Sequence, residues 1–181
     1  MPALKTPICD FGNNAKDFQL NSTINKFFSL NEIKGETGTL IMFICNHCPY
    51  VKAIIKDVVE DCNNLEKLGI KAVAISSNDV VSHPEDSFEN MIEFSKEHKF
   101  TFPYLFDNSQ DVAKSYSAVC TPDFFGFNGN LELQYRGRIR ELKDLKPVRF
   151  GESDLFKAMK QISETGKGPK EQMPSLAFVL L

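Results

Sequence analysis

Two cysteines three positions apart, Cys45 and Cys48, are the residues of this chain best suited to chemistry. The β-branched and aromatic run 41–44 precedes them, and apolar residues at helical spacing from Val51 predict an amphipathic helix directly after them. Two thiols at this spacing can close a small disulfide, and the unpaired N–H groups of a helix start favour a thiolate. The pattern therefore predicts a redox-active pair at the junction of a strand and a helix.

The order of the two cysteines predicts separate roles. We expect Cys45, the first of the pair, to lie exposed at the helix N-terminus and to act as the attacking thiolate. Cys48, one turn further into the helix, is then the resolving thiol that closes the disulfide. His47 lies between them and, when protonated, would stabilise the thiolate; the alternative is a solvated histidine without a role.

The other cysteines carry weaker signals. Cys120 stands two residues before Pro122, where it is either a third redox thiol or, as we favour, a buried small apolar side chain. Cys9 and Cys62 are expected to be passive. The total of five cysteines is an odd number, which argues against a structural disulfide framework and favours a reducing compartment.

The composition is that of an ordinary globular domain, which we expect to span residues 1–181 as one unit. Hydrophobic residues make up 42% and charged residues 25% of the chain, and the net charge is −3. The lack of a Lys/Arg cluster argues against a nucleic-acid partner. Residues 1–7 lack the apolar run of a signal peptide, and no stretch reaches the length of a membrane span. A cytoplasmic location without a membrane partner is therefore expected.

Strands and helices alternate along the rest of the chain, which favours an α/β fold. The near-continuous apolar run 70–76 follows Gly69 and predicts a buried strand, which completes a βαβ unit. A capping-box pattern from Ser82 to Glu85 predicts the start of a second helix. Further expected elements are hairpin strands 17–20 and 26–30 around a turn at 21–23, an extended segment 102–106, a helix 109–116, a hairpin 124–136 around a turn at 128–130, a helix 153–163 and a C-terminal edge strand after a flexible turn at 166–170.

Several stretches of the chain resemble the redoxin or AhpC/TSA superfamily of thioredoxin-like proteins, and in particular a subgroup that carries the motif C-N-H-C-P. The matching stretches are 43–51, 77–79, 84–91, 102–105, 120–125 and 135–138. The resemblance implies a thioredoxin-like fold, in which a central mixed β-sheet is flanked by helices, with an N-terminal β-hairpin extension. It also implies thiol–disulfide chemistry at Cys45 and Cys48, with no cofactor beyond the redox-active disulfide.

The same resemblance implies supporting residues around the pair. Asn46 and His47 belong to the C-N-H-C-P motif. Thr121 and Pro122 match the family's cis-proline loop, which lies against the redox pair and offers backbone groups to an incoming peptide. The segment 174–178 is Pro-Ser-Leu-Ala-Phe, so the cysteine with which members of the subgroup often end is absent from it.

Three functions compete. The leading one is a thiol–disulfide oxidoreductase that acts on a disulfide-containing protein or a small-molecule disulfide, with a thioredoxin- or glutathione-type electron donor. The second is a peroxiredoxin-like thiol peroxidase with an antioxidant role. Met42 occupies the position where peroxiredoxins carry a threonine or serine, so we expect no hydroxyl beside Cys45 to orient a peroxide. The third is a soft-metal carrier that uses Cys45, Cys48 and His47.

Overall fold

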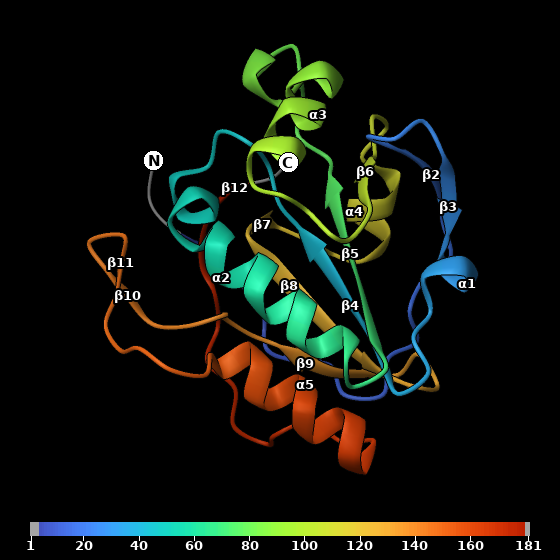
Figure 1. Ribbon diagram of the computed structural model, residues 1–181, viewed down its shortest axis with the longest axis vertical. Coiled ribbons are helices and arrows are strands. Elements are labelled where there is room, and N and C mark those ends of the chain that lie inside the picture. The colour runs from blue at the N-terminus through green and yellow to red at the C-terminus, as the bar shows by residue number, and fades with distance from the viewer. Residues whose placement is uncertain (1–3, 180–181) are drawn as a thin grey trace.

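A seven-stranded mixed sheet forms the centre of the molecule, whose computed structural model describes residues 4–179 (Figure 1). Its strands follow the order β3-β2-β6-β5-β4-β8-β9. The inner strands β4, β5 and β6 run parallel, whereas the β2–β3 and β8–β9 hairpins join them antiparallel. The strands are Gln19–Ser22 (β2), Phe27–Ser29 (β3), Gly38–Phe43 (β4), Ile70–Ser76 (β5), Tyr104–Phe106 (β6), Asp123–Asn128 (β8) and Leu133–Arg136 (β9).

Helices cover both faces of this sheet because alternate side chains of each strand point to opposite sides. Leu40 and Met42 of β4 pack with residues of α2, α3 and α5 in one buried cluster. Ile41 and Phe43 of the same strand pack with residues of α1 and α4 in a second cluster. Figure 1 shows α2 and α5 in front of the sheet. The helices are Leu30–Ile33 (α1), Pro49–Glu66 (α2), Phe88–Glu97 (α3), Asp111–Ser115 (α4) and Asp154–Thr165 (α5), with a 3₁₀ turn at Pro84–Asp86.

The C-terminal strand lies outside the central sheet. β12 (Leu176–Val179) is the middle strand of a separate three-stranded sheet, between β1 (Leu4–Lys5) and β7 (Cys120–Thr121). The prediction of a C-terminal edge strand is therefore wrong in its position, because β12 finds partners on both sides. A further two-stranded ribbon joins β10 (Leu142–Lys143) to β11 (Lys146–Pro147).

The start of the second long helix also differs from the prediction. The Ser82 hydroxyl bonds the Asp79 carboxylate instead of capping a helix. Pro84–Asp86 forms only a 3₁₀ turn, and Ser87 is the N-cap of α3, where its side chain accepts a hydrogen bond from the Asn90 N–H. Ser87 lies three residues before Asn90, whose backbone N–H its hydroxyl reaches. Ser87 therefore caps the helix in place of Ser82.

The remaining elements follow the sequence closely. Both predicted hairpins form, although the turn of the first lies at 23–26, after β2, and not at 21–23. Gly69 takes a φ of +80°, which lets the chain turn from α2 into β5. The predicted α/β class, a mixed sheet flanked by helices with an N-terminal hairpin, is confirmed.

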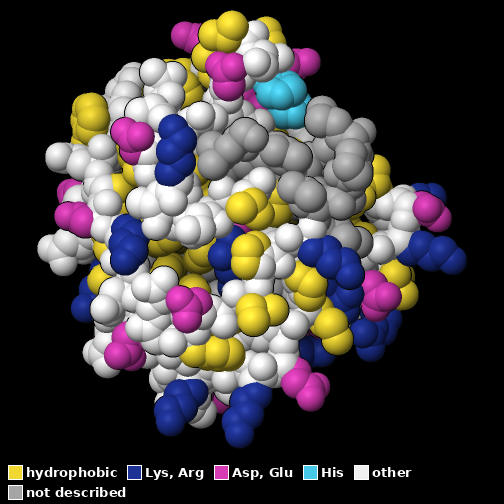
Figure 2. Space-filling model, turned by 180° about the vertical axis from the view of Figure 1, so that it is seen from behind, with side chains coloured by type: hydrophobic (Ala, Val, Ile, Leu, Met, Phe, Trp, Pro, Cys, Tyr) yellow, Lys and Arg dark blue, Asp and Glu magenta, His cyan; other side chains and the backbone are white. Residues whose placement is uncertain are grey.

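In the view from behind, neither basic nor acidic side chains form a continuous patch on the surface. Figure 2 shows Lys and Arg side chains interspersed with Asp and Glu side chains over this side of the molecule. Among the described residues, no helix is both long enough and apolar enough to cross a membrane.

Candidate redox site

The loop between β4 and α2 carries the predicted redox pair. Cys45 lies in the loop itself, whereas Cys48 is the N-cap of α2, which begins at Pro49. Proline suits the first helical position because it has no N–H to leave unpaired there. The prediction that Cys45 occupies the helix start, with Cys48 one turn inside, is therefore wrong. Both cysteines are 0% exposed, so the predicted exposure of Cys45 is wrong as well.

Thr121 contacts both thiols through different atoms. Its Oγ1 lies 3.3 Å from Cys45 Sγ, and its carbonyl oxygen accepts a hydrogen bond of 3.3 Å from the Cys48 thiol. The Thr121–Pro122 peptide bond is cis, as the family's loop implies. The expectation that no hydroxyl lies beside Cys45 is wrong, because a segment 76 residues further along the chain supplies one.

The two thiols share a hydrogen bond, so the thiol that keeps its proton stabilises the negative charge on the other sulfur. The N–H groups of Tyr50 and Val51, at the positive end of α2, also favour a thiolate in the pair. The contacts with Thr121 distinguish the two sulfurs: the Cys48 thiol donates a hydrogen bond to the carbonyl, whereas the hydroxyl beside Cys45 lowers the pKa of that thiol. Burial and the nearby Asp86 carboxylate act against a thiolate at Cys45. The predicted roles, with Cys45 attacking and Cys48 resolving, stay a prediction.

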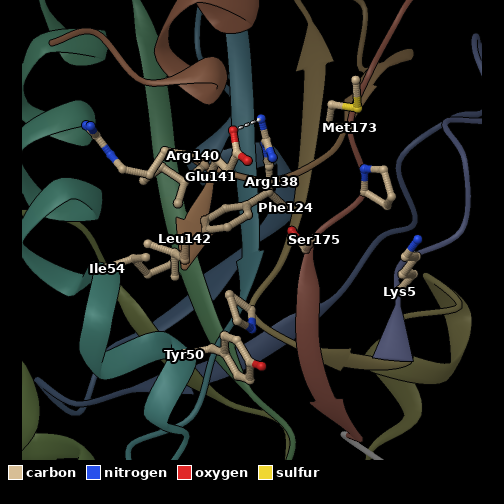
Figure 3. Close-up of a pocket in the computed structure, with 13 residues that line it drawn as sticks. Lys5, Tyr50, Ile54, Phe124, Arg138, Arg140, Glu141, Leu142, Met173 and Ser175 are labelled. Atoms are coloured by element: carbon tan, nitrogen blue, oxygen red, sulfur yellow. Dashed lines mark ion pairs between the residues drawn. The ribbon is translucent and has the colours of Figure 1, made fainter. Parts of the chain in front are cut away.

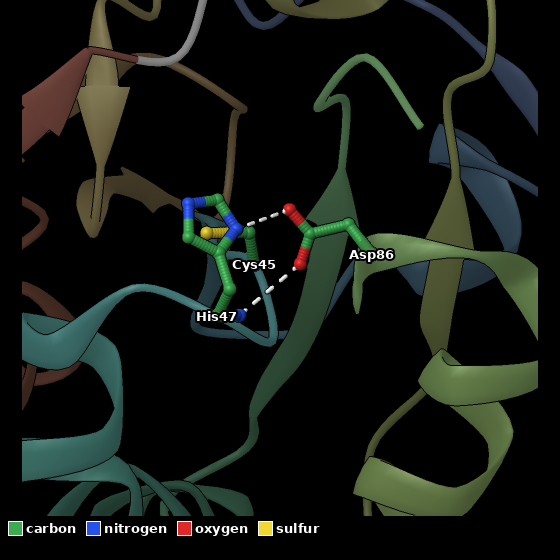
Figure 4. A group of neighbouring side chains, drawn as sticks. All are labelled: Cys45, His47 and Asp86. Atoms are coloured by element: carbon green, nitrogen blue, oxygen red, sulfur yellow. Dashed lines mark hydrogen bonds and ion pairs between the residues drawn. The ribbon is translucent and has the colours of Figure 1, made fainter. Parts of the chain in front are cut away.

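A buried carboxylate that no sequence pattern indicated, Asp86, closes the site on the side of His47 (Figure 4). Its side chain is 0% exposed. Its Oδ1 accepts hydrogen bonds from the backbone N–H groups of Asn46 at 2.7 Å and His47 at 3.1 Å. Its Oδ2 lies 2.6 Å from His47 Nδ1 and accepts a hydrogen bond from Asn78 Nδ2 at 2.9 Å. Three of these four groups belong to the two residues between the cysteines.

The loop between the cysteines is held by side chains from other elements. Asn46 Nδ2 donates to the Glu85 carbonyl at 3.1 Å, and Asn46 Oδ1 accepts from the Tyr104 hydroxyl at 2.9 Å. The His47 ring stacks on the His83 ring, with centroids 4.3 Å apart and 13° between the planes. His47 is thus held between a carboxylate and a second imidazole, which contradicts the alternative of a freely solvated side chain.

The loop that carries Thr121 is fixed by a buried ion pair. Asp123, directly after Pro122, accepts a hydrogen bond of 2.8 Å from Arg136 Nη2. The same nitrogen also donates to the Ser117 carbonyl at 2.8 Å. Burial raises the pKa of Asp123 to about 6 in spite of the arginine. The Arg136 guanidinium, which stays charged, therefore holds Asp123 in place, and with it the cis-proline loop.

The other cysteines lie in surroundings that oppose a thiolate. Cys120 is 0% exposed, and burial, with the nearby Asp123 as a second cause, raises its pKa to about 12. Burial also raises the pKa of Cys62, and it raises the pKa of the half-buried Cys9 to about 11. These surroundings suit the favoured interpretation of Cys120 as a buried apolar side chain.

A pocket of about 260 Å³ is lined by Pro122 of the cis-proline loop and has Tyr50, two residues after Cys48, at one end (Figure 3). Apolar side chains form much of its lining: Ile54, Phe124, Ile139 and Leu142. Arg138 at the opposite end pairs with Asp154 at 2.8 Å, so its charge is already compensated. A pocket of this size and character suits one apolar group of a bound substrate.

Cys45, His47 and Asp86 are residue types that can bind a metal ion, and their candidate ligand atoms lie within 4.8 Å of one another. However, both oxygens of Asp86 already take part in two polar contacts each, one of them with the imidazole. The arrangement therefore favours hydrogen bonding and proton transfer over metal binding.

The fold and the site together define a thioredoxin-like protein with a C-x-x-C pair beside a cis-proline loop. Residues 11–141 match the AhpC/TSA family, and the chain belongs to this family. An uncharacterized conserved protein from Geobacillus kaustophilus is 37% identical, with a TM-score of 0.93 over 99% of this chain and 96% of that chain. A hypothetical protein from Sinorhizobium meliloti is 31% identical, with a TM-score of 0.89 over 99% of this chain and 97% of that chain.

A more distant structure shares the fold alone. The thioredoxin domain of a thiol-disulfide oxidoreductase from Bacteroides vulgatus is 18% identical, with a TM-score of 0.59 over 70% of this chain and 86% of that chain. No curated protein matches the chain. The predicted superfamily and the thioredoxin-like fold are confirmed, while the C-N-H-C-P subgroup stays a prediction. Membership of the family supports an oxidoreductase in general.

Proposed function

We propose that the protein is a thiol–disulfide oxidoreductase that cycles Cys45 and Cys48 between a dithiol and a disulfide. One observation carries the proposal: the two thiols share a hydrogen bond, both contact Thr121, and the backbone N–H groups at the start of α2 favour a thiolate in the pair. The thiolate is the nucleophile of disulfide exchange, and a neighbouring thiol is what resolves a mixed disulfide. The substrate class is a disulfide-containing protein or a small-molecule disulfide.

The contacts of Thr121 support the order of the steps. The Cys48 thiol donates to the Thr121 carbonyl and keeps its proton, while the Thr121 hydroxyl can donate to a Cys45 thiolate. The Cys45 thiolate attacks one sulfur of the substrate disulfide, forms a mixed disulfide and releases the other substrate sulfur as a thiolate. Cys48 then loses its proton and attacks Cys45 Sγ, which closes the Cys45–Cys48 disulfide and releases the second substrate thiolate. The substrate gains two electrons, the protein pair loses two, and the released thiolates take up protons.

The remaining parts of the proposal follow from this chemistry. Thiol–disulfide exchange needs no bound cofactor beyond the redox-active disulfide. A thioredoxin- or glutathione-type thiol returns the oxidised pair to the dithiol. The cytoplasm is the compartment proposed, because it keeps free thiols reduced.

Alkylation of the reduced protein tests which sulfur is the thiolate. Iodoacetamide at about pH 7 should label Cys45 before Cys48, because the thiolate reacts and the thiol does not. Cys120, with a pKa of about 12, is the internal control and should stay unlabelled in the folded protein. Peptide mass spectrometry that finds Cys48 labelled first would reverse the roles of the two cysteines.

Trapping tests whether both thiols take part. Cys48→Ser should accumulate a mixed disulfide between Cys45 and a model disulfide peptide, because the resolving thiol is gone. Cys45→Ser should accumulate far less, and Cys62→Ser is a matched control that should behave as the wild type. If neither active-site variant forms an adduct, the two-thiol function is wrong.

A thiol peroxidase is the second candidate, and one contact favours it. The Thr121 hydroxyl lies 3.3 Å from Cys45 Sγ, where it is placed to orient a peroxide. Met42 occupies the position where peroxiredoxins carry a threonine or serine, so the strand before Cys45 offers no such hydroxyl at that position. Stopped-flow rates of the same reduced protein with hydrogen peroxide and with a model disulfide separate the two functions. We expect disulfide exchange to be faster, and a faster reaction with peroxide would make the peroxidase the better proposal.

A further inference from the structure

We propose that the C-terminal strand β12 occupies the docking site of the substrate, and that an extended segment of a disulfide-containing protein replaces it during the reaction. This inference rests on the proposed function and narrows its substrate class to polypeptides. β12 is then an intramolecular competitor, which limits access to Cys45 and Cys48 until a substrate strand displaces it.

The short strand β7 connects the redox pair to the C-terminal strand. It consists of Cys120 and Thr121, and Thr121 contacts both thiols at 3.3 Å. Phe178 and Val179 of β12 pair with β7 antiparallel, with Phe178 opposite Thr121. β12 also lies next to α2, the helix that follows the redox pair. The strand that contacts the thiols is therefore already paired with the chain's own C-terminal segment.

The register assigns one position of a docked strand to the reaction. Residues directly opposite each other in an antiparallel pair have their side chains on the same face of the sheet. The Thr121 hydroxyl lies 3.3 Å from Cys45 Sγ, so a half-cystine opposite Thr121 has its sulfur on the side of Cys45. This chain has phenylalanine at that position, Phe178, which has no sulfur to exchange. β12 thus offers the backbone of a substrate segment without its reactive group.

The burial of the redox pair requires a movement before any exchange. Both thiols are 0% exposed, so a substrate disulfide reaches neither sulfur while the chain keeps this conformation. Among the described residues, two pairs join β12 to β7 and two pairs join it to β1. Pairings this short open at a lower free energy than the strands of a central sheet. β12 is therefore the element beside the thiols that is best suited to move.

The residues before β12 are held more firmly. Ser175 is 2% exposed, its N–H donates to Thr6 Oγ1 at 2.9 Å, and its carbonyl accepts from the Thr6 N–H at 3.2 Å. Its hydroxyl donates to the Gly137 carbonyl at 3.2 Å. The Arg138 N–H donates to the Met173 carbonyl at 2.8 Å. A hinge directly after Ser175 lets β12 leave while these contacts remain.

The pocket of about 260 Å³ borders the same small sheet (Figure 3). Its lining includes Lys5 of β1, Pro122 directly after β7 and Ser175 directly before β12. A segment that replaces β12 therefore passes this pocket. An apolar side chain near the half-cystine of that segment fits the apolar part of the lining.

Cross-linking tests the register of the docked strand. In a Cys48→Ser background, with oxidised glutathione as the oxidant, Phe178→Cys should form an intramolecular disulfide with Cys45. Ala177→Cys is the matched control and should form far less, because successive residues of a strand face opposite sides. Peptide mass spectrometry identifies the bond. Equal yields from the two variants would contradict the register.

Binding kinetics test the competition. The substrate is an extended cysteine peptide in a mixed disulfide with thionitrobenzoate, whose release is followed by absorbance. Deletion of residues 176–181 should lower the apparent Kd at least about tenfold and change the limiting rate much less, because a competitor is removed. Deletion of residues 180 and 181 alone keeps the four pairs of β12 and is the control. A synthetic peptide of residues 174–181 should inhibit the longer deletion variant competitively.

Two modified substrates separate strand docking from redox chemistry. Methylation of single backbone nitrogens at the half-cystine and at its two neighbours removes one donor at a time, and at least one such peptide should bind the deletion variant several times more weakly. 4,4′-Dithiodipyridine has no peptide backbone, so its reaction with the reduced wild type reports the thiols alone. Failure of Cys45 and Cys48 to react with it would contradict the proposed function itself.

Hydrogen exchange keeps the test valid if the deletion variant fails to fold. In Cys48→Ser with the peptide trapped on Cys45, the amides of residues 176–179 should lose protection, while the Ser175 amide should keep it. Unchanged protection of residues 176–179 in this trapped complex would overturn the inference. An apparent Kd that the deletion leaves unchanged or raises would do the same, and so would equal binding of all methylated peptides.

Discussion

Two buried aspartates flank the redox pair, and their partners differ in kind. Asp86 receives two backbone N–H groups, an amide and an imidazole, none of which is permanently charged. Asp123 faces the guanidinium of Arg136, which stays protonated at all working pH values. Only the second arrangement is an ion pair with a permanently charged partner, and burial still raises the pKa of its carboxyl to about 6.

This difference separates two structural tasks at the site. The Asp86 side holds the loop between the two cysteines through the backbone N–H groups of Asn46 and His47. The Asp123 side holds the position of Thr121 and Pro122 against the two thiols. We therefore expect changes on the Asp86 side to alter the reactivity of the cysteines first, and changes on the Asp123 side to alter stability first.

The largest effect should come from Arg136→Met. The substitution leaves Asp123 buried without its partner, and such a loss costs about 3–5 kcal/mol in the free energy of unfolding. Urea titration of the reduced protein measures it. The double variant Arg136→Met with Asp123→Leu should recover a large part of this loss, because no charge then remains buried. A loss below about 1 kcal/mol for Arg136→Met would show that the ion pair does not hold the cis-proline loop.

The next largest effect should come from Asp61, a buried carboxylate outside the redox site that serves as a reference for Asp86 and Asp123. Its ionisation should make the free energy of unfolding depend on pH. Burial raises its pKa to about 6, although Ser153 donates a hydrogen bond to it. The folded chain thus holds this proton more tightly than the unfolded chain, whose carboxyl titrates near about 4. The stabilising contribution is complete below about pH 4 and is lost as the pH rises through about 6.

Asp61→Asn should remove this dependence, because the amide stays neutral. The stability of the variant relative to the wild type should rise by at most about 3 kcal/mol between about pH 4 and pH 7, which corresponds to a shift of about two units. Unfolding free energies at several pH values measure the difference. A difference that falls over this range would contradict the raised pKa of Asp61.

The smallest effect should come from Thr121→Val, which keeps the shape of the side chain and removes its hydroxyl. The lost contact with Cys45 Sγ should cost about 1 kcal/mol of stability. It should also raise the pKa of Cys45, because the hydroxyl stabilises the thiolate there. Alkylation of Cys45 and its attack on a model disulfide should therefore both become slower at about pH 7. Unchanged rates of both reactions would show that the hydroxyl does not stabilise the Cys45 thiolate.

The sequence predicts the scaffold well because short-range patterns determine it. The apolar run of β5, the helical spacing after Val51 and the Asn-Gly turn of the β8–β9 hairpin each specify a local conformation. The start of α2 is specified by a local preference as well. Proline favours the first helical position, so Pro49 places Cys48 at the N-cap.

The other half of the site could not be predicted in the same way. Asp86 lies 39 residues after His47, and only the tertiary fold brings the two together. The Thr121 hydroxyl reaches Cys45 across 76 residues for the same reason. Acidity also depends on burial and on neighbours from other elements, so the contacts that distinguish the two sulfurs could not be predicted from the order of the cysteines.

Cys45 and Cys48 belong to the same buried cluster as the apolar faces of α2 and α5, and this placement links redox state to folding. Reduction and unfolding of the disulfide and dithiol forms make a thermodynamic cycle. The difference between the unfolding free energies of the two forms therefore corresponds to the difference between the reduction potentials of the folded and the unfolded chain. For two electrons, about 30 mV corresponds to about 1.4 kcal/mol. Denaturant titrations of the two forms therefore measure the driving force of the pair without any substrate. A folded dithiol that is more stable than the folded disulfide marks an oxidant, and the reverse order marks a reductant.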